Sequence, residues 1–204
     1  MSRYKPTQII LGNKRHKRIV LEVIQCFPLL PDVLLTVREY RKSEKIANSE
    51  KVERGRFDQK TRTIRMLEPL DDTAFKAVFI HEVAHALIYL SKKGMSPAQR
   101  RLAYADKLTT FLGRDFLPSL NRIAESAQRI LGTTYIDEIF LASMNLSGYT
   151  ADFIKQLANQ SEEILCDLFT LYCLTKFRTV GMPFREAFVE LMLSLNIPVL
   201  AGTV

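Results

Sequence analysis

The chain has 204 residues, of which 47% are apolar, and a formal net charge of +7. This length suits one well-filled domain, or one with two lobes and a cleft between them, and the apolar content excludes disorder as its overall state. The sequence contains no run of 18 uncharged apolar residues, so it predicts no membrane span. The charged N-terminus is not followed by an apolar signal segment. We therefore expect a cytoplasmic protein or one exported by a non-Sec route.

The first third of the chain predicts one helix and a small, mostly antiparallel sheet. Apolar residues at helical spacing predict a helix over residues 16–28, which two prolines then end. Three strands are expected next, with a hairpin turn at residues 58–60 between the second and the third. The strands are Val33 to Arg38, Lys51 to Phe57 and Thr61 to Met66.

The rest of the chain predicts helices. We expect Asp72 to cap a long helix that ends near Leu90, and Ser96 with Gln99 to form the start of the next. Together these elements predict an α+β fold in a single domain, residues 1–204, with a β-containing lobe (1–95) and a helical lobe (96–204). Further helices are predicted near residues 97–112, 115–131, 135–145, 151–177 and 183–195, the helix over 151–177 with a break near Asn159.

Positive charge is concentrated near the N-terminus. Residues 1–66 hold 16 Lys and Arg against 7 Asp and Glu, and the densest run is Lys14 to Arg18. Such a run can bind nucleic acid, an anionic membrane surface or an acidic substrate. No aromatic residues alternate with it to stack on bases, so we favour a solvated start of a helix over a nucleic-acid site.

The three cysteines predict buried thiols in a reducing compartment. Cys26, Cys166 and Cys173 are odd in number and scattered, which does not suit a disulfide framework. Cys166 and Cys173 lie seven residues apart among apolar residues, so we expect both to belong to the core and not to bind metal.

The segment His81-Glu82-Val83-Ala84-His85 matches the pattern H-E-x-x-H. Residues four apart on a helix share one face and lie about 6 Å apart along its axis, so the two imidazoles can bind one Zn²⁺. Glu82 lies about 100° further round the helix, where it can take a proton from a water at the metal and pass it to the leaving amine. The pattern predicts a zinc hydrolase.

A chance match on a core helix is the alternative explanation for this segment. The chain has only three histidines, so the placement of two of them four apart around a glutamate is rare by chance. The helix is also apolar nearly all round, and two histidines and a carboxylate buried there are costly unless they are paired or bound to metal. Both facts favour a metal site.

A catalytic zinc site needs a third protein ligand and one position for water. No histidine follows His85, and His16 lies far upstream, so a carboxylate is expected. Glu163 is the preferred ligand, and Asp167, four residues on, would accept the other ring N–H of a ligand histidine. Alternatively, Glu162 and Glu163 only stabilise a helix N-terminus. The competing carboxylates are Asp137, Glu138, Glu186 and Glu190.

The two segments resemble the gluzincin arrangement of zinc peptidases, in which H-E-x-x-H and a downstream Glu hold the metal. The helix "SEEILCDLFTLYCL" is similar both to the minimal and HtpX-like peptidases and to the anthrax lethal factor catalytic domain and its Pro-Pro endopeptidase relatives. The resemblance covers about 25 residues and implies a zincin-like fold: a small sheet, the active-site helix and a helical C-terminal lobe. The interval between His85 and Glu163 is longer than in most soluble gluzincins, which implies an inserted lobe.

The resemblance also implies an oxyanion-stabilising tyrosine and a strand at the edge of the cleft. The family position for the tyrosine holds none here, and Tyr149 is the substitute that we name ahead of Tyr135 and Tyr172. The strand before the active helix would pair with substrate peptide. That strand contains Arg62 and Ile64, and its arginines would favour acidic or neutral peptides.

Three functions are therefore considered. The first is a zinc endopeptidase acting on a protein or peptide, for example as a secreted effector or toxin. The second is a regulatory metalloprotease of a DNA-binding partner, which the basic region would help to dock. The third is a non-enzymatic basic binding module in which the H-E-x-x-H match is a coincidence.

Overall fold

The computed structural model describes residues 8–27, 36–40, 54–67, 70–91, 94–112, 122, 151–176, 178 and 181–197. These residues form one four-stranded sheet and five helices, a roughly α+β arrangement. The chain divides into two compact units, one comprising Met1–Tyr89 with Leu200–Val204 and the other comprising Leu90–Val199.

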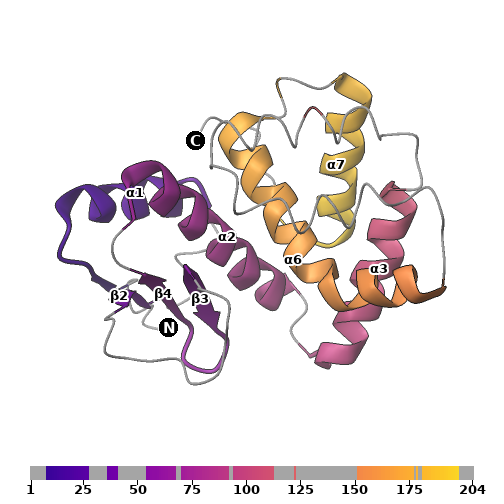
Figure 1. The fold of residues 1–204 in the computed structure, drawn as a ribbon, viewed down its shortest axis with the longest axis horizontal. Coiled ribbons are helices and arrows are strands. Elements are labelled where there is room, and N and C mark those ends of the chain that lie inside the picture. Colours follow the sequence, from indigo (N-terminus) through magenta and orange to yellow (C-terminus); the bar gives the residue numbers. More distant parts are fainter. Residues whose placement is uncertain are drawn as a thin grey trace, which may run out of the picture. The chain divides into compact units, whose positions relative to one another are not determined.

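The first unit contains the sheet, and the second contains helices (Figure 1). In chain order, the elements that begin in the first unit are β1 (Gln8–Ile10), α1 (Lys14–Gln25), β2 (Thr36–Tyr40), β3 (Gly55–Asp58), β4 (Thr63–Leu67) and α2 (Asp72–Ser91). The second unit contains α3 (Pro97–Leu112), α6 (Ala151–Thr175) and α7 (Met182–Ser194).

The sheet is mixed, and the prediction of a mostly antiparallel sheet is wrong. Its strand order is β1-β2-β4-β3. β1 pairs with β2 and β2 pairs with β4 in parallel, whereas only β3 and β4 are antiparallel. β1, which has three residues, was not predicted from the sequence. Because α1 connects β1 to β2, the two strands form a crossover unit, and such a unit makes them parallel.

The prediction that the strand before the active helix lies at the edge of the sheet is also wrong. β4 pairs with β2 on one side and with β3 on the other, so no peptide can add to it. Ile64 is fully buried within β4, and Arg62 lies in the preceding turn with a φ of 52°. Among the described strands, β1 and β3 form the two edges.

Local turn and capping signals account for most of the boundaries. The carboxylate of Asp58 accepts hydrogen bonds from the backbone of Lys60 and Thr61, at 2.9 and 3.1 Å, and so closes the predicted turn between β3 and β4. Asp72 does not cap α2 as predicted. Its neighbour Asp71 does, because the Asp71 carboxylate accepts a hydrogen bond from the backbone N–H of Ala74 at 2.8 Å.

The capping box predicted at the start of α3 is confirmed. The backbone N–H of Gln99 donates to the Ser96 hydroxyl at 3.2 Å, and the backbone N–H of Ser96 donates to the Gln99 side chain at 2.9 Å. The predicted helices over 97–112, 151–177 and 183–195 correspond to α3, α6 and α7, and α6 continues through Asn159 without the predicted break. The predicted helices over 115–131 and 135–145 lie outside the described residues, except Arg122.

In the first unit, α2 packs against the sheet. Val37, Ile64 and Met66 are fully buried, and the ring of Phe57 on β3 lies 6.1 Å from that of Tyr89 on α2. α1 is attached to the first turns of α2 through His16, whose ring stacks on that of Phe75 with centroids 3.9 Å apart. The histidine that is not part of the H-E-x-x-H motif therefore has a packing role.

In the second unit, α3 packs against α6 and α7. The ring of Phe111 on α3 lies 5.3 Å from that of Phe184 on α7, and Tyr172 on α6 lies 5.3 Å from Phe188 on α7. These aromatic side chains are the large contacts of a three-helix core.

α2 is the one helix among the described residues that is long and apolar enough to cross a membrane by length and composition. Most of it is buried inside the protein, and a buried core helix passes the same test. The finding is therefore weak support for a membrane span.

Because β4 lies inside the sheet and β1 at its edge, two matched substitutions should lower the free energy of unfolding by unequal amounts. Ile64→Ala should lower the free energy of unfolding by about 2–5 kcal/mol, because Ile64 is fully buried. Ile10→Ala, on the edge strand β1, should change it by no more than about 0.5 kcal/mol, because Ile10 is 60% exposed. Urea unfolding measures both, and equal losses would contradict the strand order.

Candidate metal centre

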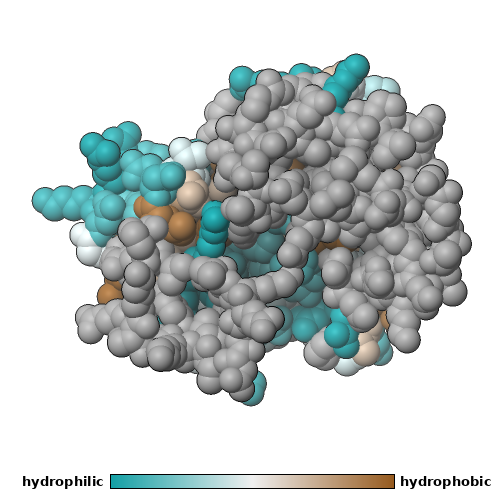
Figure 2. Space-filling model, viewed as in Figure 1, coloured by the Kyte–Doolittle hydropathy of each residue, from teal (hydrophilic) through white to brown (hydrophobic). Residues whose placement is uncertain are grey.

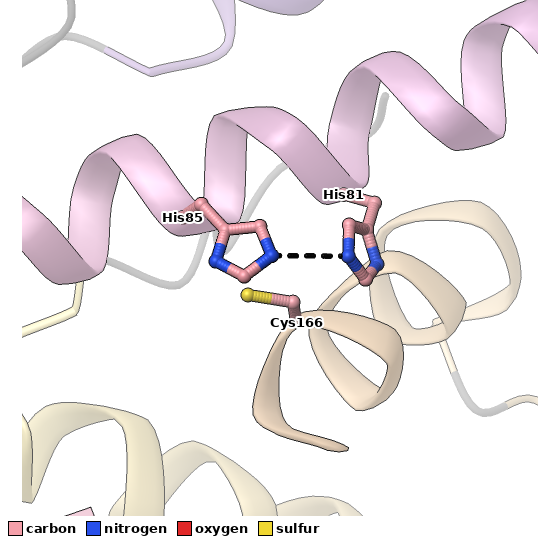
Figure 3. Close-up of side chains that lie close together, drawn as sticks. All are labelled: His81, His85 and Cys166. Carbon is pink, nitrogen blue, oxygen red and sulfur yellow. Dashed lines mark hydrogen bonds between the residues drawn. The ribbon is translucent and has the colours of Figure 1, made fainter. Parts of the chain in front are cut away.

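The two histidines of the motif lie on one face of α2. Their ring centroids are 4.9 Å apart, and the Nε2 atom of His81 lies 3.1 Å from the Nε2 atom of His85 (Figure 3). His81 is 4% exposed, and His85 is half-buried. The helical spacing of four residues therefore places the expected donor atoms next to each other, with one of them nearly closed to solvent.

The Nε2 separation fits a shared zinc ion. Two imidazole nitrogens held at about 2.0–2.1 Å from a tetrahedral ion lie about 3.3–3.4 Å apart. The observed 3.1 Å is a few tenths of an ångström shorter and needs only small side-chain rotations. The same separation also fits a hydrogen bond between one neutral imidazole and the other, so the distance alone does not identify an ion.

Glu82 is buried beside this pair at 5% exposure. Its side chain lies against β3, where a Cβ atom added to Gly55 would be 3.0 Å from Glu82 Cγ and 3.0 Å from Glu82 Oε1. The carboxylate is thus held between its own helix and an edge strand of the sheet. A carboxylate in such a position has lost most of its hydration, which is costly unless the charge is paired or hydrogen-bonded.

A third donor joins the histidines in the structure. The ligand atoms of His81, His85 and Cys166 all lie within 4.8 Å of one another (Figure 3). Thiolate sulfur and imidazole nitrogen are both common zinc ligands. This buried group is compatible with a metal ion, although its donors do not by themselves identify zinc. Cys166 was predicted to lie in the core, and its exposure in the structure is 0%.

The predicted ligand Glu163 is not part of this group. Its side chain is exposed, whereas its neighbour Glu162 is half-buried and Asp167 is 4% exposed. Glu162 and Cys166 lie four residues apart and so share one face of α6, about 100° from the face of Glu163. Glu163 as a zinc ligand, and Asp167 as the acceptor that orients a ligand histidine, stay predictions.

Tyr104 on α3 was missed by the sequence analysis. It is fully buried, and its pKa is raised to about 12, first by that burial and then by the negative charge of Glu162. The phenol therefore keeps its proton at neutral pH and can donate a hydrogen bond near Glu162. In the sequence it appears only as part of the buried stripe of α3, with Leu108 and Phe111, so no local signal distinguishes it.

Other candidates contribute nothing to the site in the part of the chain that the structure describes. Glu186 and Glu190 are exposed on α7. Tyr172 is half-buried, and burial raises its pKa. Tyr149, the predicted oxyanion-stabilising residue, lies outside the described residues, as do Tyr135, Asp137 and Glu138.

The basic run lies on α1 as a solvated helix start. Its four Lys and Arg side chains are exposed, and Figure 2 shows hydrophilic side chains over α1. Arg18 pairs with Glu22 at 2.7 Å, and Arg15 lies 3.7 Å from Asp72. Exposed pairs of this kind contribute little stability. Two of the cations thus already have acidic neighbours within the protein.

The sequence matches no protein-family model and no curated protein, and the structure matches no solved structure. The resemblance to gluzincins therefore depends on the two sequence segments alone.

Zinc retention tests the histidine pair. His81→Ala and His85→Ala should each abolish retention of about one zinc per chain, because two donors on one helix face would be reduced to one. His16→Ala is the matched control: it removes a buried histidine that stacks on Phe75 and should keep the metal. Elemental analysis after dialysis measures all three, and zinc loss in the control alone would refute the assignment.

A second set of variants identifies the third donor. Cys166→Ala should weaken zinc retention, whereas Cys173→Ala, another buried thiol of α6, should leave it unchanged. Glu162→Ala and Glu163→Ala test the carboxylates in the same assay. If Glu163→Ala releases the metal and Cys166→Ala does not, the ligand set predicted from the sequence is right and the sulfur is a neighbour only.

Proposed function

We propose that the protein is a zinc-dependent peptidase with a zincin-like arrangement, which is of gluzincin type if a glutamate of α6 provides the third ligand. The observation that supports this most directly is the 3.1 Å separation of the His81 and His85 Nε2 atoms on one face of α2, with the Glu82 carboxylate buried next to them. Two donors for a metal and one group able to move a proton thus share two turns of one helix.

A purely structural role for these three side chains is the weaker explanation. The residues around them on α2, including Phe79, Ile80 and Val83, are buried and apolar. Leucine or alanine at positions 81, 82 and 85 would fill the same space without removing polar groups from water. Two imidazoles four residues apart on a helix, with a glutamate between them, are the set that a zinc hydrolase needs, so a chemical use for them is the simpler explanation.

The donor set also indicates how the residues would act. His81 and His85 would bind zinc, and α6 would provide the third ligand. The ion would polarise the substrate carbonyl and lower the pKa of a bound water. Glu82 would accept a proton from the attacking water and deliver it to the amine nitrogen as the C–N bond breaks. Hydroxide thus ends on the carbonyl carbon and the proton ends on the leaving amine.

The position of β3 favours a peptide as substrate. No described strand pairs with its outer edge, and β3 lies directly against Glu82 through Gly55. Peptides bind exposed strand edges through main-chain hydrogen bonds, which recognise any extended chain. An extended substrate paired with β3 would run close to the catalytic carboxylate. A hydrolase of small molecules does not need such an exposed strand edge beside its catalytic residue.

Glu82→Gln separates catalysis from metal binding. The variant should keep zinc and its melting temperature, because Gln fills the same volume and neither group binds the metal. Peptide hydrolysis should fall by about 10²–10⁴-fold, the usual contribution of a general base. Glu22→Gln, an exposed glutamate on α1, is the matched control and should remain fully active. Near-normal turnover by Glu82→Gln on a validated substrate would refute the proposal.

Metal content and salt dependence distinguish the alternatives. A basic binding module with a coincidental motif would hold no zinc after purification. A regulatory protease that docks through α1 would lose partner binding as salt is raised, because counterion release makes such contacts salt-dependent. A peptidase without such a docking site would hold zinc and would show little salt dependence.

A further inference from the structure

Gly55 occupies a position where the chain has no room for a side chain. A Cβ atom there would lie 2.5 Å from Val78 Cγ1, 3.0 Å from Glu82 Cγ and 3.0 Å from Glu82 Oε1. Real Cβ atoms essentially never approach another heavy atom closer than 3.0 Å, so alanine would force α2 or its side chains to shift. Both neighbours lie on α2, one helical turn apart, and one of them is the proposed general base.

The backbone at Gly55 does not explain the glycine. Among the described residues Gly94 is the one glycine with a positive φ, so Gly55 has a conformation that other residues adopt readily. Glycine inside a strand costs about 0.5–1 kcal/mol relative to alanine and offers no side chain to pack. Close approach to α2 remains as the reason for glycine at this position.

We propose that Gly55 is a positioning residue for Glu82: it allows β3 to approach α2 closely enough to fix the carboxylate in one place. The inference rests on the proposed peptidase function. Gly55 acts on the carboxylate only through the space that it leaves for Glu82. Because the Cβ position lies equally close to Cγ and Oε1 of Glu82, a methyl group there would rotate or displace the carboxylate itself.

The proposal predicts a specific kinetic change in Gly55→Ala. A displacement of about 1 Å of a catalytic group can cost about 100-fold in rate, so kcat should fall by about that factor. KM should change little, and zinc retention should be unchanged, because His81 and His85 lie outside the contact. A distorted site in general would change all three. Gly181→Ala is the matched control, since its Cβ would meet only Pro183 Cδ at 3.6 Å, an ordinary contact.

Val78→Ala separates the two contacts that Gly55 makes with α2. In the double variant Gly55→Ala/Val78→Ala, the 2.5 Å contact with Val78 Cγ1 is removed while the contact with Glu82 remains. The melting temperature should recover only part of the way toward that of Val78→Ala alone, because the contact with Glu82 remains, whereas kcat should stay low. If kcat also returns to the Val78→Ala value, Gly55 serves helix packing only and the proposal is wrong.

A stability cycle tests the same contact without any activity. The loss in melting temperature caused by Gly55→Ala should be smaller in a Glu82→Ala background, measured on metal-free protein, because the group that the methyl meets is gone. Equal losses in both backgrounds would overturn the proposal. If wild-type protein holds no zinc and cleaves no peptide, the peptidase function fails, whereas this cycle still reports whether Gly55 and Glu82 are coupled.

Discussion

The burial of α2 is the constraint on which the rest of the structure depends. Twelve of its residues are buried, among them His81 and Glu82, so other elements must cover the helix on nearly every side. The sheet covers part of it through the ring of Phe57, which lies against Tyr89, and through Gly55, which lies against Val78 and Glu82. The cost of burying polar groups in such a helix therefore applies directly to His81 and Glu82, which are 4% and 5% exposed.

The sequence predicted the elements that local chemistry determines and missed those that depend on distant pairing. The Ser96–Gln99 capping box and the Asp58 turn both follow from residues three apart or fewer, and both are present. β1 was missed because three residues, Gln8–Ile10, carry no periodic signal and form a strand only by pairing with β2. The interior position of β4 depends on partners on both sides, and no local pattern contains that information.

In the candidate site, too, the residues fixed by one helix could be predicted, whereas those fixed by tertiary packing could not. The H-E-x-x-H pair could be predicted because one helix fixes its geometry, and the Nε2 atoms do lie 3.1 Å apart. A donor from α6 depends on the rotation of a second helix, where one residue corresponds to about 100°. Glu162, Glu163, Cys166 and Asp167 are all reasonable donors or partners in sequence, and only tertiary packing decides which are buried. Tyr104 was missed for the same reason, since its neighbour Glu162 lies 58 positions further along the chain.

Gly55 illustrates why reactive residues are easier to find than the residues that hold them in place. A motif identifies Glu82 by its chemistry. Gly55 contributes by having no side chain, and the presence of a glycine in a strand can have many reasons. Only the distance from a hypothetical Cβ to Glu82, 3.0 Å, distinguishes a required glycine from a tolerated one. General-base catalysis depends on placing a carboxylate within hydrogen-bond reach of the proton that it takes. The space beside the base is therefore as much a part of the site as the base itself.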